Sequence, residues 1–248
     1  MTLETTKPQG VPDSLLAGRT STAVHWLAYA SLLGNGCFAI AVLGLHLLQP
    51  ERSPLSEAVS FYAHGAHGWL LTVGLVAWSF GSGALLVGLA RTFRGRMGSA
   101  SLGGLAIWSV GVFLGGVFRA DPPGHWDQPP SVGGLIHGNA ALVAFVSLPV
   151  AALLLARRQR HDPQWRRVAR ASGVLAIATM VSLVAFFASL VPVFFSPGPP
   201  KLLGLTERIL LSVYVAWLGV TAIGLLRCST DRTCQTRSPA WLSNQNRT

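Results

Sequence analysis

The residues of this sequence that are best suited to chemistry are ionisable side chains at the ends of long apolar segments. Histidine beside a carboxylate suits acid–base catalysis or metal binding, and arginine suits anionic groups. Ionisable groups inside a membrane usually face the protein interior or water, whereas those at the membrane surface are solvated at little cost. Each one is therefore either a site residue or an ordinary interfacial residue. The set comprises His46, His64, His67, Arg119, Asp121, His125, Asp127, His137, Glu207 and Arg208.

Two arginines of this set predict an anion-binding pocket. Arg119 and Arg208, with the amino ends of neighbouring helices, would form a positive pocket for an anionic or zwitterionic headgroup. His137 would supply a further hydrogen bond to that headgroup. Alternatively, Asp121 and Glu207 pair with the arginines and simply fix the helix ends.

A metal site is a second possibility for the same residues. His64 and His67 lie three apart, and with His137 and Asp121 they would make a three-histidine, one-carboxylate site of the kind that binds zinc. Histidines three apart without a third ligand at a diagnostic spacing are commonly interfacial, and His125 adds no such spacing. We therefore predict no cofactor and no metal ligands, and keep zinc as an alternative.

Composition points to a membrane protein as the scaffold for these residues. Of 248 residues, 50% are hydrophobic and 11% are charged, and the mean hydropathy is +0.47, which is too apolar for an ordinary soluble domain. Apolar runs are long enough to cross a bilayer as helices, and too long for the short alternating strands of a barrel. The prediction is an all-α polytopic transmembrane bundle of about six helices. The runs lie near 23–48, 67–90, 100–118, 132–156, 168–195 and 206–227.

Loop charge predicts the orientation of this bundle. Six crossings place both termini on one side, and the arginines concentrate in segments 91–98 and 157–170. Short cytoplasmic loops collect Lys and Arg, so both termini are predicted to be cytoplasmic. The segments 49–66, 119–131 and 196–205 then form the non-cytoplasmic loops, and the ionisable set lies at that end.

Domain boundaries follow from the same runs. We expect a disordered cytoplasmic tail over 1–22, one six-helix domain over 23–227 and a second disordered tail over 228–248. The net charge of +10 comes mainly from arginines between apolar runs, which indicates topology signals and not nucleic-acid binding. We expect a multi-pass protein of the bacterial plasma membrane whose partners are membrane lipids.

Glycines within the predicted helices indicate close helix packing. Gly111 and Gly115 have a GxxxG spacing in the third helix, and Gly134 and Gly138 have the same spacing in the fourth. Small residues allow helix backbones to approach closely in lipid, so we expect these glycines to serve packing within the bundle. The oligomeric state is not predicted by this pattern.

Four short segments together resemble a known family. They are SFYAHGAHGW at 60–69, FRADPPG at 118–124, GLIH at 134–137 and GLTER at 204–208. In order and spacing they are similar to the domain of unknown function 998 family of bacterial and archaeal membrane proteins, over approximately residues 23–227.

The resemblance implies six membrane helices and a set of site positions, but no established activity. The family turn more often reads Phe-Pro-Thr-Asp, so Arg119 and Ala120 depart from it. His64, His67 and His125 lie outside the family pattern, which weakens the zinc alternative. The matching positions are an aspartate after the third helix, a histidine opening the fourth and a Glu-Arg pair opening the sixth: Asp121, His137, Glu207 and Arg208.

Three functions are compatible with these observations. The first is a non-enzymatic protein that binds a small amphiphile or lipid headgroup at the non-cytoplasmic helix ends. The second is an intramembrane enzyme in which Asp121 and His137 act as an acid–base pair, or hold zinc, on a lipid or isoprenoid-like substrate. The third is a proton-coupled transporter, which would call for carboxylates near the membrane midplane and broken helices. Asn35 and Pro192 interrupt the apolar runs, and both residue types are commonly structural in such positions.

Overall fold

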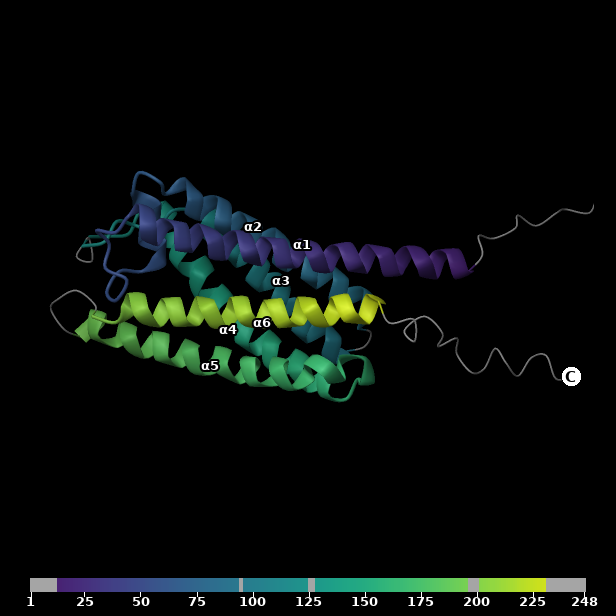
Figure 1. The fold of residues 1–248 in the computed structure, drawn as a ribbon. Helices are drawn as coiled ribbons and strands as arrows, with labels where there is room; N and C mark the ends of the chain where they lie inside the picture. The colour runs from purple at the N-terminus through teal and green to yellow at the C-terminus, as the bar shows by residue number, and fades with distance from the viewer. Residues whose placement is uncertain (1–12, 94–95, 125–127, 196–200, 231–248) are drawn as a thin grey trace, which may run out of the picture.

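The protein is an all-α bundle of six long helices in a computed structural model (Figure 1), which confirms the predicted fold class. The structure describes residues 13–93, 96–124, 128–195 and 201–230, and these residues include no β-strand. The described residues also form two short 3₁₀ helices. The elements are α1 (Asp13–Leu48), η1 (Val59–His64), α2 (Trp69–Thr92), α3 (Arg96–Val117), α4 (Val132–Arg160), η2 (Pro163–Trp165), α5 (Arg166–Phe195) and α6 (Leu203–Thr230).

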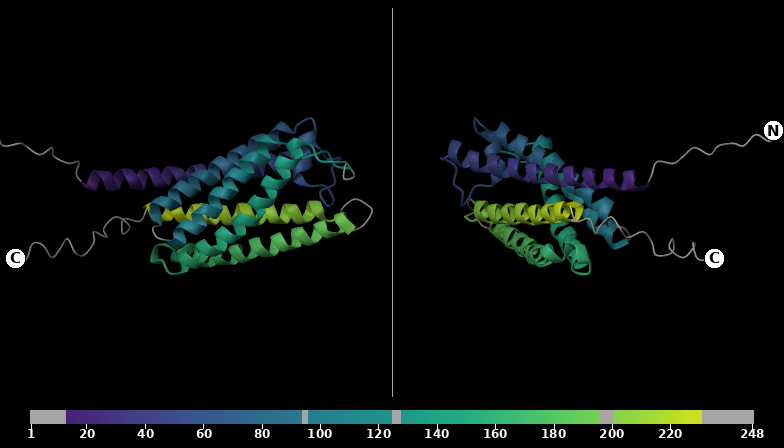
Figure 2. Two further views of the ribbon diagram at one scale, coloured as in Figure 1. Left: turned by 180° about the vertical axis from the view of Figure 1, so that it is seen from behind. Right: turned by 45° about the vertical axis from the view of Figure 1, so that its right-hand side comes forward.

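The six helices form a closed ring in chain order. Each helix packs against its neighbours in sequence, and α6 returns to pack against α1. The described ends of the chain, Asp13 and Thr230, lie at the same end of the bundle, and η1 lies at the opposite end (Figures 1 and 2). We call the latter the η1 end. Those of the predicted site positions that the structure describes belong to this end. The side of the membrane on which it lies stays a prediction from loop charge.

All six helices have the length and apolarity needed to cross a membrane, which matches the predicted number. The spans begin at or near the expected residues, and large apolar side chains such as Leu47 and Val132 are exposed on the outside of the bundle. Exposed apolar surface of this extent suits lipid and not water. The chain is therefore a multi-pass membrane protein.

Helix α1 starts earlier than the hydropathy pattern indicated. It begins at Asp13, inside the segment 1–22 that was expected as a tail, although its membrane-spanning part begins at Thr22. Hydropathy marks where lipid begins, but a helix satisfies its own backbone and can continue into water. Residues 1–12 and 231–248 of the expected tails lie outside the described residues.

A chain of aromatic rings, one from each helix, crosses the middle of the bundle. Successive ring centroids lie 4.0, 4.9, 5.4, 6.2 and 5.5 Å apart. Each of these residues is 9–13 positions from the η1 end of its helix, which is a depth of about 14–20 Å at 1.5 Å per residue. We call this the aromatic belt: Phe38, Trp78, Trp108, Tyr214, Phe145 and Phe186.

The polar atoms of the belt are satisfied within the protein. Trp78 Nε1 donates to Asn35 Oδ1 at 2.5 Å, and Trp108 Nε1 donates to Ser82 Oγ at 3.1 Å. The Tyr214 hydroxyl donates to a backbone carbonyl of α4 at 2.7 Å. Buried polar groups are costly unless they are paired. Asn35 therefore has a structural role in holding Trp78.

Gly111 permits a close approach of α3 and α4, which agrees with the packing role predicted for it. A Cβ added there would lie 2.8 Å from both the Ala140 carbonyl oxygen and the Ala144 Cβ, whereas one added at Gly103 on the same helix meets nothing within 4 Å. We expect Gly111→Val to lower the free energy of unfolding in detergent by about 1–3 kcal/mol, the usual cost of overpacking. Gly103→Val is the matched control. Equal thermal stability of the two variants would contradict this packing role.

Candidate functional site

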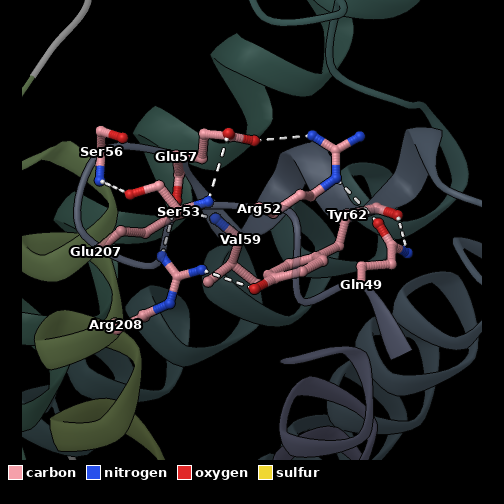
Figure 3. A network of polar contacts seen from close by, with 9 residues as sticks. All are labelled: Gln49, Arg52, Ser53, Ser56, Glu57, Val59, Tyr62, Glu207 and Arg208. Carbon is pink, nitrogen blue, oxygen red and sulfur yellow. Dashed lines mark hydrogen bonds and ion pairs between the residues drawn. The ribbon is translucent and has the colours of Figure 1, made fainter. Parts of the chain in front are cut away.

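Arg208 is the centre of a polar network at the η1 end. Its Nε donates to His46 Nε2 at 2.8 Å, and its Nη1 donates to the carbonyl oxygens of Glu57 at 2.7 Å and Gly204 at 2.9 Å. Its Nη2 donates to the Tyr62 hydroxyl at 3.3 Å, and the guanidinium also lies 5.6 Å from the centre of that ring (Figure 3). One side chain thus joins α1, the loop after it, η1 and α6.

The loop after α1 carries a second layer of this network (Figure 3). Gln49 Nε2 donates to the Tyr62 carbonyl at 3.1 Å, and Arg52 Nε donates to Gln49 Oε1 at 2.9 Å. Arg52 also forms an ion pair with Glu57 at 2.9 Å. Because Arg208 contacts the backbone of Glu57, the two layers hold this loop on the helix ends.

Glu207 points away from its neighbour Arg208, into the interior of the bundle. Consecutive residues of an α-helix are about 100° apart around its axis. The Glu207 side chain is only 6% exposed, and its Oε2 accepts a hydrogen bond from the Val59 backbone N at 2.6 Å. Close approach of the loop to α6 depends on Gly204, where a Cβ would lie 2.8 Å from the Pro54 carbonyl oxygen.

His137 is oriented by the carboxyl-terminal end of α3. Its Nδ1 lies 3.0 Å from the Gly115 carbonyl oxygen and 2.9 Å from that of Phe118. A carbonyl oxygen only accepts hydrogen bonds, so Nδ1 carries the proton in this arrangement. In the neutral ring, Nε2 is then a hydrogen-bond acceptor.

Asp121 caps the start of α4. Its Oδ2 accepts from the Ser131 backbone N at 3.1 Å, and Ser131 Oγ accepts from the Gly134 backbone N at 2.9 Å. A carboxylate near a helix amino terminus is stabilised by the unpaired N–H groups there. A Cβ at Gly134 would collide with the Asp121 carboxylate. Asp121 therefore positions the helix that carries His137.

A cavity of about 400 Å³ lies inside the helix ring, between the η1 end and the aromatic belt. Residues of all six helices and η1 line it, and nearly all of them are apolar. Among its described lining residues, the titratable side chains are those of His137 and Glu207. We call this space the central cavity.

A second cavity, of about 370 Å³, lies between α1 and α6. Its polar lining residues include Arg208 and His46. Phe38, Val59 and Leu211 line both spaces and so separate this α1–α6 cavity from the central cavity. Glu207 and Arg208 are adjacent in sequence, yet they line two different cavities.

A family model described as "Protein of unknown function (DUF998)" matches residues 32–224, more than half of the chain. The chain belongs to the DUF998 family. The matched range contains Asp121, His137, Glu207 and Arg208. Comparisons with curated proteins and with solved structures found no match.

Among the described residues, Arg119 and Arg208 do not line one shared pocket. The Arg119 side chain is exposed, has no hydrogen-bond partner among the described residues and does not line the cavity of Arg208. Within the described ranges, no ion pair joins an arginine to Asp121 or Glu207, because both carboxylates accept from backbone N–H groups instead.

The peripheral candidates His64 and His67 do not lie on one shared face of a helix. His64 Nε2 lies 2.7 Å from the Ala120 carbonyl oxygen, and His67 Nδ1 is buried without a partner among the described residues. Both precede α2, which begins at Trp69. His125 lies outside the described residues, as does Asp127. In the part of the chain that the structure describes, no group of three or more His, Cys, Asp or Glu side chains is placed to hold a metal ion.

The partners of Arg208 and Glu207 are what sequence reasoning missed. His46 belonged to the ionisable set, but its contact with Arg208 spans 162 positions of sequence. The Val59 backbone N–H that holds Glu207 has no side-chain signal at all. Tyr62 lies in the family-like segment 60–69, which was the one available indication of its role.

Proposed function

We propose that this DUF998 protein is a membrane-embedded binding protein for a single-chain amphiphile. The apolar tail occupies the central cavity, and the polar end meets His137 and Glu207. The observation that carries this proposal is a cavity of about 400 Å³ with apolar walls and two titratable side chains. Small-molecule sites commonly have this size and this combination of apolar walls with few polar groups.

The chemistry of the two side chains favours a hydrogen-bond donor at the polar end of the ligand. His137 Nε2 is an acceptor when Nδ1 donates to the α3 carbonyls, and Glu207 already accepts from Val59. An alcohol or an amine complements two acceptors, whereas a deprotonated anionic group has no hydrogen to donate to them. This replaces the anionic headgroup expected from sequence with a hydroxyl or ammonium group for this cavity.

A cavity-filling substitution tests the proposal. A Cβ at Gly138, which lines the central cavity, meets nothing within 4 Å, so a larger side chain fits there by displacing ligand. We expect Gly138→Phe to weaken binding of a long-chain alcohol or amine at least about tenfold, since displacing two methylenes costs roughly 0.8 kcal/mol each. Binding is measured by calorimetry with detergent-purified protein.

Gly103→Phe is the matched control for this experiment, because Gly103 has equal open space and does not line the central cavity. It should bind like the wild type. A fatty acid of the same chain length should bind more weakly than the alcohol. Equal binding by Gly138→Phe and Gly103→Phe, or tighter binding of the fatty acid, would reject the proposal.

An enzymatic function keeps one observation in its favour, namely that two groups capable of acid–base chemistry line one cavity. The pair is His137 with Glu207 and not His137 with Asp121, since Asp121 caps α4. Mass spectrometry of the amphiphile after incubation with the protein distinguishes the cases. Recovery of unchanged ligand supports binding alone, and conversion that is lost in Glu207→Gln supports catalysis.

A further inference from the structure

The α1–α6 cavity opens on the outside of the bundle. Two of its lining residues, Leu43 on α1 and Ser212 on α6, are exposed, and Leu43 is 66% exposed. The remaining walls include Phe38, Val42 and Leu211. In a membrane this outer surface faces lipid, so the cavity is accessible from the bilayer.

Arg208 brings a positive charge to this cavity without a direct ion pair to a carboxylate of the described residues, although the Glu207 carboxyl group interacts with it electrostatically without a contact. Its four hydrogen bonds go to a histidine nitrogen, two carbonyl oxygens and a phenol, which are all neutral groups. Within the described ranges, no ion pair includes it. Charges in membrane proteins are costly and are usually paired. Arg208 therefore has the electrostatics of a site that takes an anion from outside the chain.

His46 orients the guanidinium without neutralising it. Its Nδ1 lies 2.7 Å from the Val42 carbonyl oxygen and carries the proton, which leaves Nε2 to accept from Arg208 Nε. The four hydrogen bonds of Arg208 use four of the five N–H groups of an arginine, so one donor remains for a ligand.

The depth of Arg208 matches that of lipid headgroups. It lies five positions after the start of α6, at Leu203, which is about 8 Å from the η1 end. The headgroup layer on each side of the hydrocarbon core is about 5–8 Å thick. A lipid with its phosphate at this level has its acyl chains alongside the apolar part of the cavity.

We infer that the α1–α6 cavity binds an anionic phospholipid of the surrounding membrane, with its phosphate at Arg208 and an acyl chain along α1 and α6. This site is separate from the central cavity and does not depend on the function proposed for it. Guanidinium groups bind phosphate through strong charge-assisted hydrogen bonds.

Two substitutions of His46 test whether the positive charge of Arg208 binds the lipid phosphate. His46→Glu places a carboxylate beside the guanidinium, so the protein itself supplies the anion, whereas His46→Gln keeps a neutral acceptor there. Native mass spectrometry of the full chain in detergent counts bound phosphatidylglycerol against phosphatidylcholine. We expect wild type and His46→Gln to bind phosphatidylglycerol about tenfold more tightly than phosphatidylcholine, which is the effect of one charge-assisted hydrogen bond. His46→Glu should lose this preference.

A second pair of variants tests the cavity without altering Arg208 or His46. Ser212→Phe fills the α1–α6 cavity and should lower phosphatidylglycerol occupancy. Ile209→Phe, at an exposed position of α6 that lines neither cavity, should not. Wild-type protein that binds both lipids equally would overturn the inference, as would a His46→Glu variant that keeps the preference. Displacement of the lipid by excess inorganic phosphate would reassign the site to free phosphate.

Discussion

Replacing Arg208 by alanine is expected to release the loop after α1 and to destabilise the protein. The substitution removes four hydrogen bonds, to His46, Glu57, Gly204 and Tyr62. With charged donors worth roughly 1.5–3 kcal/mol each and part of the loss recovered by water, we expect a cost of about 2–4 kcal/mol. Thermal unfolding in detergent measures this loss.

Limited trypsin digestion reports the loop itself. Arg52 lies in that loop and its side chain is 16% exposed in an ion pair with Glu57. Cleavage after Arg52 should be slow in the wild type and fast in Arg208→Ala, because the backbone of Glu57 loses its anchor. The rate of cleavage in Arg208→Lys should fall between those of the wild type and Arg208→Ala, since an ammonium group cannot reproduce the planar set of donors of a guanidinium.

Arg119→Ala is the control for these measurements. Arg119 lies at the same end of the bundle, is exposed and has no hydrogen-bond partner among the described residues. Its loss should change stability by no more than about 0.5 kcal/mol. If Arg208→Ala were as stable and as protease-resistant as Arg119→Ala, the network of Figure 3 would have no structural role.

Glu207 is expected to show two separable effects. Glu207→Leu leaves the Val59 N–H without its acceptor in a buried position, which should cost about 1–3 kcal/mol. Glu207→Gln keeps an oxygen acceptor for Val59 but removes the ionisable carboxyl group, which an ammonium ligand would pair with in its charged form. It should therefore fold normally and bind a long-chain amine about tenfold more weakly, the effect of one charged hydrogen bond.

The exposed carboxylate Glu51 provides the comparison for both variants. Glu51→Leu and Glu51→Gln should leave thermal stability and amine binding near the wild-type values. A stable Glu207→Leu variant would show that the Val59 contact contributes nothing to folding. Unchanged amine binding by Glu207→Gln would remove Glu207 from the ligand site and leave His137 as its remaining titratable group.

The helices and their membrane character were predictable because the signals are local. A span needs about 20 apolar residues, and its backbone hydrogen bonds form within the same segment. The residue at which α1 begins was less predictable. Asp13 starts the helix well before the membrane-spanning part at Thr22, because a helix can continue into water beyond the residues that contact lipid.

The end of the bundle that carries the candidate residues was predictable, but the hydrogen-bond partners of these residues were not. The family-like segments pointed to Asp121, His137, Glu207 and Arg208, and all four lie at the η1 end. The alternative that the carboxylates pair with arginines is not seen among the described residues, where backbone N–H groups, which carry no sequence signature, hold both carboxylates.

The sequence by itself determined six membrane helices and the end of the bundle that carries the ionisable groups, because hydropathy and residue type are local properties. The tertiary structure alone decided which of the two cavities each of these groups lines. Glu207 and Arg208 are neighbours in the chain, yet the helix turns them into two cavities separated by Phe38, Val59 and Leu211. His137 and Glu207 line one cavity because the helices form a ring around it, and His46 contacts Arg208 because that ring closes between α1 and α6.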